Sequence, residues 1–174
     1  MSSKFQMEGN VPDALEIQQI LTRYVLALGC RQPSELTACF ASHAELDLSG
    51  VNVTSVEDYI RLCKEGLAKL DATHHQLGMP AIHREGDRAW SRCYFTAQHV
   101  SSALLPNGFL LIGGWYDDEL VRTEDGWRIS RRRGIPVFIE GNPAVLGMDF
   151  PIGAPMRCSG HAMPQWARAN PDAA

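Results

Sequence analysis

Four long extended segments in the second half of the chain restrict its fold more than any other feature of the sequence. These segments cover residues 76–85, 89–105, 109–123 and 127–139. The turns between them carry Gly86-Asp87, Asn107-Gly108 and Asp125-Gly126. Turns of this composition between segments rich in β-forming residues are typical of antiparallel hairpins. The sequence therefore predicts a meander of antiparallel strands over this half of the chain.

An amphipathic helix is predicted well before the meander, over residues 12–29. Its apolar side chains recur at helical spacing and form one continuous face. Asp13 followed by Glu16 resembles a capping box, in which acidic side chains satisfy free backbone amides of the first turn. Gly29 suits the left-handed position that commonly ends a helix. These signals set the expected bounds of the helix.

Three more elements are predicted between this helix and the meander. A short helix covers residues 34–40, a strand covers 44–50, and a further helix over 55–70 begins at Ser55 with Asp58 three residues on. Helices followed by a run of strands are the element order of an α+β protein. We therefore expect a curved antiparallel sheet wrapped around the N-terminal helices. Such a sheet encloses an apolar pocket between helix and strand.

Composition divides the chain into three expected parts. Residues 1–12 form an N-terminal arm, residues 13–140 form the α+β cone domain, and residues 141–174 form a C-terminal tail. The tail is rich in proline, glycine and alanine, so we expect it to be irregular and to lie over the domain or reach a neighbouring molecule. A length of 174 residues also favours one domain.

The charge and cysteine content exclude several classes of function. The formal net charge is -4, and the basic run "RISRRRG" is too short to predict binding to nucleic acid or to an anionic membrane. No apolar stretch approaches the length of a membrane span, and the first residues lack the apolar core of a secretory signal, so a cytoplasmic protein is expected. The five cysteines are irregularly spaced, without a C-x-x-C pair. We expect neither a metal site nor a cofactor.

Several stretches of the chain resemble one known family. They are "IQQILTRYVLALG", "THHQLGMPAI", "GDRAWSRCYF" and, as the most specific, "GGWYDDELVRTEDGWRISRR". Together with the order of the elements they resemble the SnoaL-like proteins of the nuclear transport factor two-like superfamily. That superfamily includes scytalone dehydratase, steroid Δ-isomerase and hexachlorocyclohexane dehydrochlorinase. The resemblance covers about residues 12–138 and implies the cone fold, but this fold hosts enzymes of several classes and non-catalytic subunits.

The resemblance places a catalytic base at His75. In the dehydratase and dehydrochlorinase branch a histidine abstracts a proton, and an aspartate at the end of the first helix orients it. The aspartate position falls at Gly29 in this chain, which is a departure from the family pattern. The alternative is that a backbone carbonyl satisfies His75 at the start of a strand. Its neighbour His74 should point to the opposite side if both are extended.

Three further residues are candidates for holding or protonating a substrate oxygen. Tyr24 lies on the apolar face of the first helix, where a buried ring in the core is the alternative. Asp47 alternates with Leu46 and Leu48 in the predicted strand, and a solvated face is the alternative. The resemblance places Arg132 where dehydrochlorinase-like relatives have a cationic residue inside the pocket. A surface charge run is the alternative for Arg132.

Alternation along residues 89–100 separates the expected pocket lining from the outer face. One face carries Ser91, Cys93, Phe95, Ala97 and His99. The resemblance makes this the pocket side, with Phe95 as an apolar wall and Tyr116 on a lining position of the next strand. His99 is expected as polar lining of the pocket or at its rim. Cys93 is expected to pack, since no group that would stabilise its thiolate is evident.

Alternation in the last extended segment sorts its residues in the same way. Trp127, Ile129 and Arg131 are expected on one side, and Arg128, Ser130 and Arg132 on the other. Asp117 and Asp118 are expected to be solvated acids near a turn. Neither they nor the histidines show a metal-binding spacing.

A histidine at the base position that the resemblance implies, within an apolar pocket, predicts a cofactor-independent lyase, dehydratase or isomerase. It would use acid–base chemistry on a small, mostly apolar molecule, aromatic or polycyclic. One alternative is a binding protein that sequesters such a molecule without chemistry, which the glycine at position 29 favours. Another is a structural subunit like the small subunit of ring-hydroxylating dioxygenases. A homodimer or homotrimer is expected, with Trp90, Tyr94 and Trp115 supplying apolar contact between copies.

Overall fold

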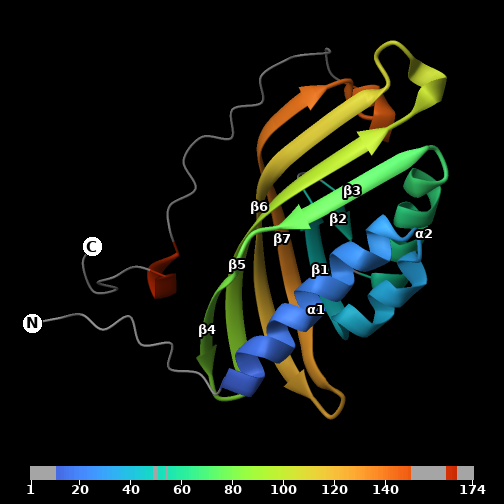
Figure 1. Ribbon diagram of the computed structural model, residues 1–174. Coiled ribbons are helices and arrows are strands. Elements are labelled where there is room, and N and C mark those ends of the chain that lie inside the picture. The colour runs from blue at the N-terminus through green and yellow to red at the C-terminus, as the bar shows by residue number, and fades with distance from the viewer. Residues whose placement is uncertain (1–10, 49–50, 54, 150–163, 168–174) are drawn as a thin grey trace, which may run out of the picture.

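A curved sheet packs against two helices in the computed structural model, which describes residues 11–48, 51–53, 55–149 and 164–167 (Figure 1). The helices are α1 (Val11–Gly29) and α2 (Val56–Leu67). The strands are β1 (Phe40–Leu48), β2 (Val51–Val53), β3 (Ala72–Leu77), β4 (Ala81–Glu85), β5 (Arg88–Val100), β6 (Phe109–Thr123) and β7 (Gly126–Gly141). Short 3-10 helices cover Pro33–Cys39, Ser102–Leu104, Pro143–Leu146 and Gln165–Ala167.

The strand order of the sheet is β2-β1-β7-β6-β5-β3, and β4 pairs with the other end of β5. The strands β5, β6 and β7 form the expected antiparallel meander. The predicted α+β class and the curved sheet around N-terminal helices are confirmed. The expectation of a purely antiparallel sheet is wrong at one place, because β1 pairs with β7 in parallel. In the chain, α2 and the strands β2 to β6 lie between these two strands, so no hairpin constrains their direction.

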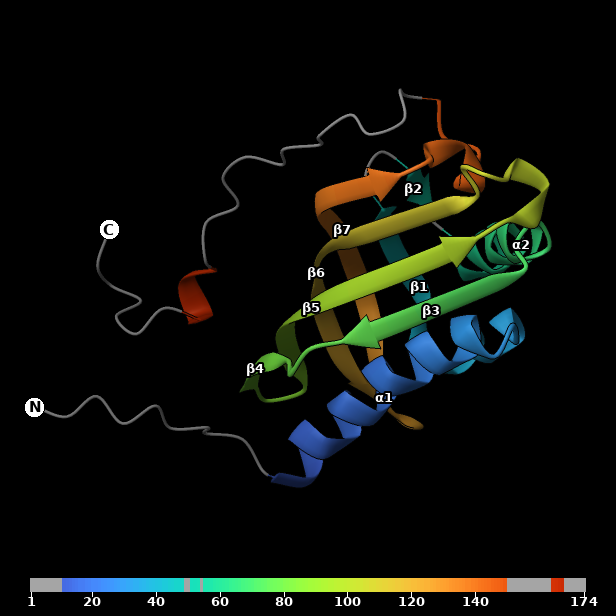
Figure 2. The ribbon, with the colours of Figure 1, turned by 45° about the horizontal axis from the view of Figure 1, so that its top comes forward.

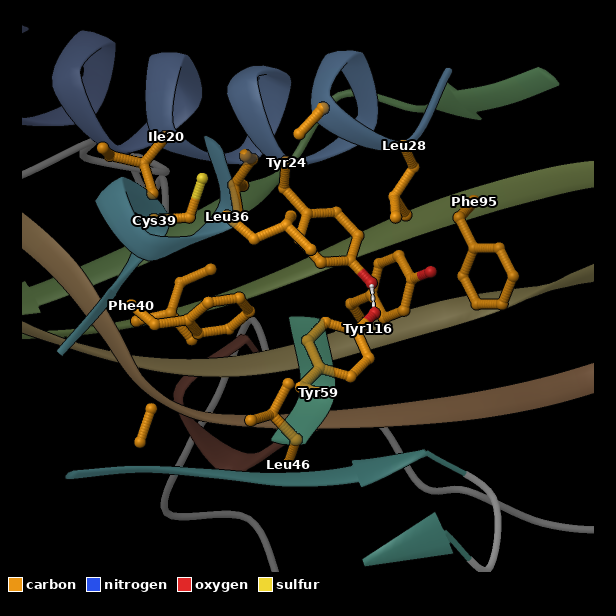
Figure 3. Close-up of a cluster of buried hydrophobic side chains, with 14 of the residues drawn as sticks. Ile20, Tyr24, Leu28, Leu36, Cys39, Phe40, Leu46, Tyr59, Phe95 and Tyr116 are labelled. Carbon is orange, nitrogen blue, oxygen red and sulfur yellow. Dashed lines mark hydrogen bonds between the residues drawn. The ribbon is translucent and has the colours of Figure 1, made fainter. Parts of the chain in front are cut away.

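Both helices cover the concave face of the sheet, and α1 runs beside the edge strand β3 (Figures 1 and 2). The apolar face of α1 is buried there, as its periodicity predicts. Hydrophobic side chains from the two helices, the 3-10 helix before β1 and the strands make one continuous core. Figure 3 shows that Tyr24, Tyr59, Phe95 and Tyr116 meet inside this core.

The acidic residues of the first turn of α1 do not cap the helix, and the predicted capping box is wrong. The helix already begins at Val11. Asp13 is buried and pairs with Arg122, while the Glu16 carboxylate accepts a hydrogen bond from the Trp127 backbone N–H at 2.8 Å. Both acids therefore fasten α1 to the hairpin between β6 and β7.

The C-terminal end of α1 lies at Gly29, as predicted, but the left-handed residue is Arg31, with φ 58°. The Gln32 N–H donates to the Ala27 carbonyl at 2.8 Å, and the Arg31 N–H to the Leu28 carbonyl at 3.1 Å. This is the hydrogen-bond pattern of a Schellman motif, which accepts an arginine here in place of the usual glycine. Gly29 is therefore not required by backbone geometry.

The other local predictions have mixed outcomes. Ser55 caps α2, because its side chain accepts from the Asp58 N–H, as expected. The first part of the tail packs on the domain, where Val145 is buried. The arm at 1–10 and most of the tail lie outside the described residues. Within the part of the chain that the structure describes, no helix is long and apolar enough to cross a membrane.

Candidate functional site

Two histidines on neighbouring strands lie close together on the inner side of the sheet. His75 is on β3 and His99 is on β5, where it is buried. Their ring centroids are 5.3 Å apart and the rings meet edge to face, at 70°. His74 is exposed on the other side of β3, as alternation predicts. Of its two adjacent histidines, β3 therefore presents His75 to the interior and His74 to solvent.

The two inner histidines differ in their hydrogen bonds. The His99 Nδ1 atom lies 3.0 Å from the Thr73 hydroxyl, which also lies 3.2 Å from the Gln98 carbonyl oxygen. The His75 Nδ1 atom is buried and has no hydrogen-bond partner among the described residues. His75 thus keeps a nitrogen available for a bound molecule, whereas His99 is tied to β3.

Burial makes both imidazoles weak bases. Burial, together with smaller contributions from the nearby His99 and His74, lowers the pKa of His75 from 6.5 to about 4. Burial also lowers the pKa of His99 to about 4. Both rings are therefore neutral near pH 7, the protonation state in which an imidazole can accept a proton.

No carboxylate of the described residues takes the place of the aspartate expected at the end of α1. Gly29 is exposed, and a Cβ atom built there meets no atom within 4 Å. Among the described residues, no carboxylate forms a hydrogen bond or ion pair with His75. The histidine is present at the position that the family resemblance indicates, but its orienting carboxylate is absent.

A buried arginine lies deeper in the interior. Arg132 is fully buried and forms a bidentate ion pair with Asp118, with Nε–Oδ1 and Nη2–Oδ2 distances of 2.7 Å each. The rings of Tyr24 and Tyr116 lie on either side of its guanidinium, 4.0 and 4.3 Å from Cζ. Burial acts to lower the pKa of Arg132, but the charge and hydrogen bonds of Asp118, together with Tyr24 and Tyr116, outweigh burial and hold the pKa above its ordinary value. The remaining Nη1 has no partner in the described structure.

Phenol groups and an aromatic wall lie together in the interior (Figure 3), and two of the phenol rings are those that contact Arg132. The hydroxyls of Tyr24 and Tyr59 share a hydrogen bond of 2.5 Å. Phe95 stacks on Tyr116, with ring centroids 4.3 Å apart. Burial raises the pKa of all three tyrosines, so their hydroxyls stay protonated. They can donate hydrogen bonds, but they do not supply a phenolate.

A β-bulge explains why Arg132 is inside. Arg131 pairs with Glu119 and Ile129 pairs with Leu120, so Ser130 is an extra residue in β7. The extra residue turns Arg131 to the outer face and brings Arg132 to the same side as Ile129. The strict alternation expected for this strand is therefore wrong. The expectation that Asp118 is solvated is also wrong, because Asp118 is buried as the partner of Arg132.

Asp47 and Cys93 have different surroundings. Asp47 lies on the outer side of β1, where it is half exposed and 3.6 Å from Arg133. The structure does not bring it to the interior, since the buried Leu46 occupies the inner side. Cys93 is buried, and its thiol donates to the Gly78 carbonyl at 3.1 Å. Burial raises the pKa of Cys93 to about 11, which agrees with a packing role.

A hollow of about 230 Å³ opens between α1 and the connection from β3 to β4. It is lined by Gln18, Leu21, Thr22, Leu77, Gly78, Met79, Pro80 and Cys93. Leu77 lies on the same side of β3 as His75, two residues away along the strand. The hollow thus adjoins the histidine pair, although neither histidine lines it.

Comparison with known proteins identifies the family. The model of the SnoaL-like domain matches residues 10–133. An uncharacterized protein of Mycobacterium tuberculosis is 33% identical over 129 residues, which cover 70% of this chain and 84% of that protein.

The chain belongs to the SnoaL-like family.

Solved structures agree with the SnoaL-like assignment. A Kribbella flavida protein is 24% identical, with a TM-score of 0.71 over 75% of this chain and 94% of that one. A candidate scytalone dehydratase of Novosphingobium aromaticivorans is 20% identical, with a TM-score of 0.70 over 88% and 97% of the two chains. A hexachlorocyclohexane dehydrochlorinase is 18% identical, with a TM-score of 0.67 over 82% and 97%. At these identities the similarities establish the fold of this SnoaL-like chain.

Three residues of this SnoaL-like interior were not identified from the sequence. Thr73 lies two residues before His75 on β3, so alternation alone could have placed both side chains on the same face. Tyr59 lies on the predicted second helix, where nothing distinguishes it from other core residues. Asp118 carried no local signal, because its partner is fourteen residues away on the next strand. No cluster of three or more histidine, cysteine or acidic residues suited to a metal occurs in the described ranges.

Proposed function

We propose that this protein is a cofactor-independent lyase or isomerase that acts by acid–base chemistry, with His75 as the proton acceptor. The observation that carries the proposal is the buried, unpartnered Nδ1 atom of a neutral His75 beside His99. A buried polar atom without a partner costs free energy, and a bound molecule that supplies the missing hydrogen bond recovers it. Such an atom in an otherwise apolar interior is therefore a natural contact for a substrate.

The proposed reaction begins with transfer of a proton from a substrate carbon to His75. The electron pair of the broken C–H bond forms a carbon–carbon double bond. In a lyase the leaving group departs from the adjacent carbon with its own electron pair, and in an isomerase the proton returns to a different carbon. Tyr24 and Tyr59, protonated and hydrogen-bonded to each other, are the proposed donors to a developing negative charge.

The surroundings support a small, mostly apolar substrate. Phe95 and Tyr116 provide stacked aromatic walls, and the Nη1 atom of Arg132 provides N–H donors for an oxygen or halide. Two of the proteins with this fold are named for dehydration of scytalone and for dehydrochlorination of hexachlorocyclohexane. We propose cyclic compounds that carry a hydroxyl or halogen next to an acidic C–H bond as the substrate class.

Replacement of His75 tests this proposal. The wild-type protein is incubated with a panel that includes scytalone and hexachlorocyclohexane, and products are followed by absorbance and by chloride release. For any compound that is turned over, His75→Gln is expected to lower kcat/KM about a hundredfold, the scale of general-base catalysis. His74→Gln is the matched control, because His74 is exposed. Equal activity of a folded His75→Gln variant and the control contradicts the proposal.

A carboxylate at position 29 should strengthen the proposed base. Gly29→Asp is expected to raise the pKa of His75 above about 4, by about one unit or more, because a nearby negative charge favours the imidazolium. The open space at Gly29 admits the side chain. NMR titration of the imidazole signals measures the shift, with Gly29→Asn as the uncharged control. Identical titrations of both variants and wild type would show that position 29 does not act on His75.

A second candidate is a binding protein that retains an apolar molecule unchanged. The low pKa of His75 and the open position at Gly29 favour it, because a weakly basic imidazole without a carboxylate hydrogen-bonds better than it abstracts protons. Saturable binding of a panel compound with full recovery of that compound supports this candidate. Formation of any product that depends on His75 excludes it.

A homodimer or homotrimer remains our proposal for the assembly. Tyr94 is 64% exposed on the outer face of β5 and packs edge to face on Trp115 of β6, with ring centroids 5.8 Å apart. Exposed aromatic side chains of this kind are common at protein interfaces. Light scattering measures the mass in solution, and a monomer contradicts the proposal.

A further inference from the structure

The hydroxyl of Thr73 has two neighbours, and counting protons assigns the direction of both hydrogen bonds. A threonine hydroxyl has one proton to donate and lone pairs that accept. The Gln98 carbonyl oxygen, 3.2 Å away, can only accept. When Thr73 donates to this oxygen, its hydrogen bond with His99 Nδ1, at 3.0 Å, must be donated by the imidazole. The proton of the neutral His99 ring then resides on Nδ1.

We infer that Thr73 positions His99 by fixing its Nδ1–H tautomer, which leaves the lone pair on Nε2 for the bound molecule. Thr73 and His99 are direct cross-strand partners in the β3–β5 pairing, so their side chains stand on the same face at the closest lateral spacing. The Nε2 atom has no hydrogen-bond partner among the described residues. Since this ring is neutral and buried, no second proton competes for Nε2 near pH 7.

Thr73 is thus a positioning residue in a chain that has no carboxylate at position 29. An imidazole acts as an acceptor at one defined atom only when another group holds its tautomer. Of the two inner histidines, His99 has such a group in the described structure and His75 does not. His99 therefore offers a hydrogen-bond acceptor of fixed orientation at Nε2 to the bound molecule, beside His75 as the proposed proton acceptor. The catalytic part of this inference rests on the proposed function, whereas the tautomer does not.

Histidine NMR tests the tautomer without any substrate. In ¹⁵N-labelled protein at neutral pH, long-range proton–nitrogen correlations separate a protonated from an unprotonated ring nitrogen, and a His99→Gln spectrum assigns the signals. We expect wild-type His99 to show a protonated Nδ1 and an unprotonated Nε2. Thr73→Val keeps the shape but removes the hydroxyl, and is expected to shift His99 toward the Nε2–H tautomer. Thr73→Ser restores the hydroxyl and the wild-type pattern.

Kinetics on any panel compound that is turned over tests the positioning role. Thr73→Val is expected to lower kcat about tenfold with a smaller change in KM, because the acceptor is present but less often in the correct tautomer. Thr73→Ser is expected to recover most of this loss. A wild-type His99 protonated on Nε2, or a pattern unchanged in Thr73→Val, overturns the inference. The expected tautomer without turnover of any compound instead counts against the proposed function and leaves the tautomer assignment standing.

Discussion

Asp118→Ala is expected to lower the free energy of unfolding by about 3–5 kcal/mol, the scale measured when one partner of a buried ion pair is removed. The pair is fully buried, with two hydrogen bonds of 2.7 Å from Arg132. Removal of the carboxylate leaves a guanidinium without a counter-charge between the rings of Tyr24 and Tyr116. Urea denaturation followed by circular dichroism measures the loss.

A double variant separates the cost of an unpaired charge from the cost of lost packing. Asp118→Leu with Arg132→Met removes both charges, and this double variant is expected to be more stable than Asp118→Ala. Asp47→Ala is the matched control on the outer face, because it breaks a half-exposed pair with Arg133. It is expected to cost less than about 1 kcal/mol. Similar losses for Asp118→Ala and Asp47→Ala contradict the prediction.

The fold could be predicted largely because its hydrophobic pattern is regular. Helical spacing predicts α1 with its C-terminal end at Gly29. Alternation correctly places His74 on the outer side. It also correctly places on the inner side every second residue of β5, namely Ser91, Cys93, Phe95, Ala97 and His99. These predictions depend on one repeating geometry, in which neighbouring residues of a strand point to opposite faces. The likeness to a known family then supplied the position of His75, which periodicity does not single out.

Predictions failed where a single residue breaks the repeat or where the partner is distant along the chain. One bulge at Ser130 puts Arg132 on the same side of β7 as Trp127 and Ile129, whereas strict alternation had placed it on the opposite side. Asp118 reads as a surface acid beside Asp117 until the pairing of β6 with β7 brings it to Arg132. The hydrogen bond between His99 and Thr73 likewise depends on the register of β3 against β5. Register is a tertiary property, and local propensity does not specify it.

Acid is expected to destabilise this protein through the two inner histidines. In the folded protein the pKa of both His75 and His99 is lowered from 6.5 to about 4. Between these values the unfolded chain binds two protons that the folded protein does not bind, so the free energy of unfolding falls as pH falls from about 6.5 to about 4. The loss has an upper limit of about 3 kcal/mol for each histidine, and it levels off below the folded pKa.

Denaturation in urea at a series of pH values measures this slope. The pKa of Asp13 is lowered by its hydrogen bond with Arg122. The contribution of Asp13 to the free energy of unfolding is therefore lost only below the ordinary carboxylate pKa of about 4, outside the pH range in which the histidines act. His99→Gln is expected to remove about half of the slope, and His74→Gln, at an exposed position, should leave most of it in place, because His74 is the smallest of the three causes that lower the pKa of His75. A wild-type stability independent of pH across this window contradicts the buried, neutral state of the pair. Because proton acceptance by His75 requires the same neutral state, the acid limb of any pH–rate profile should lie near pH 4 instead of near pH 6.5.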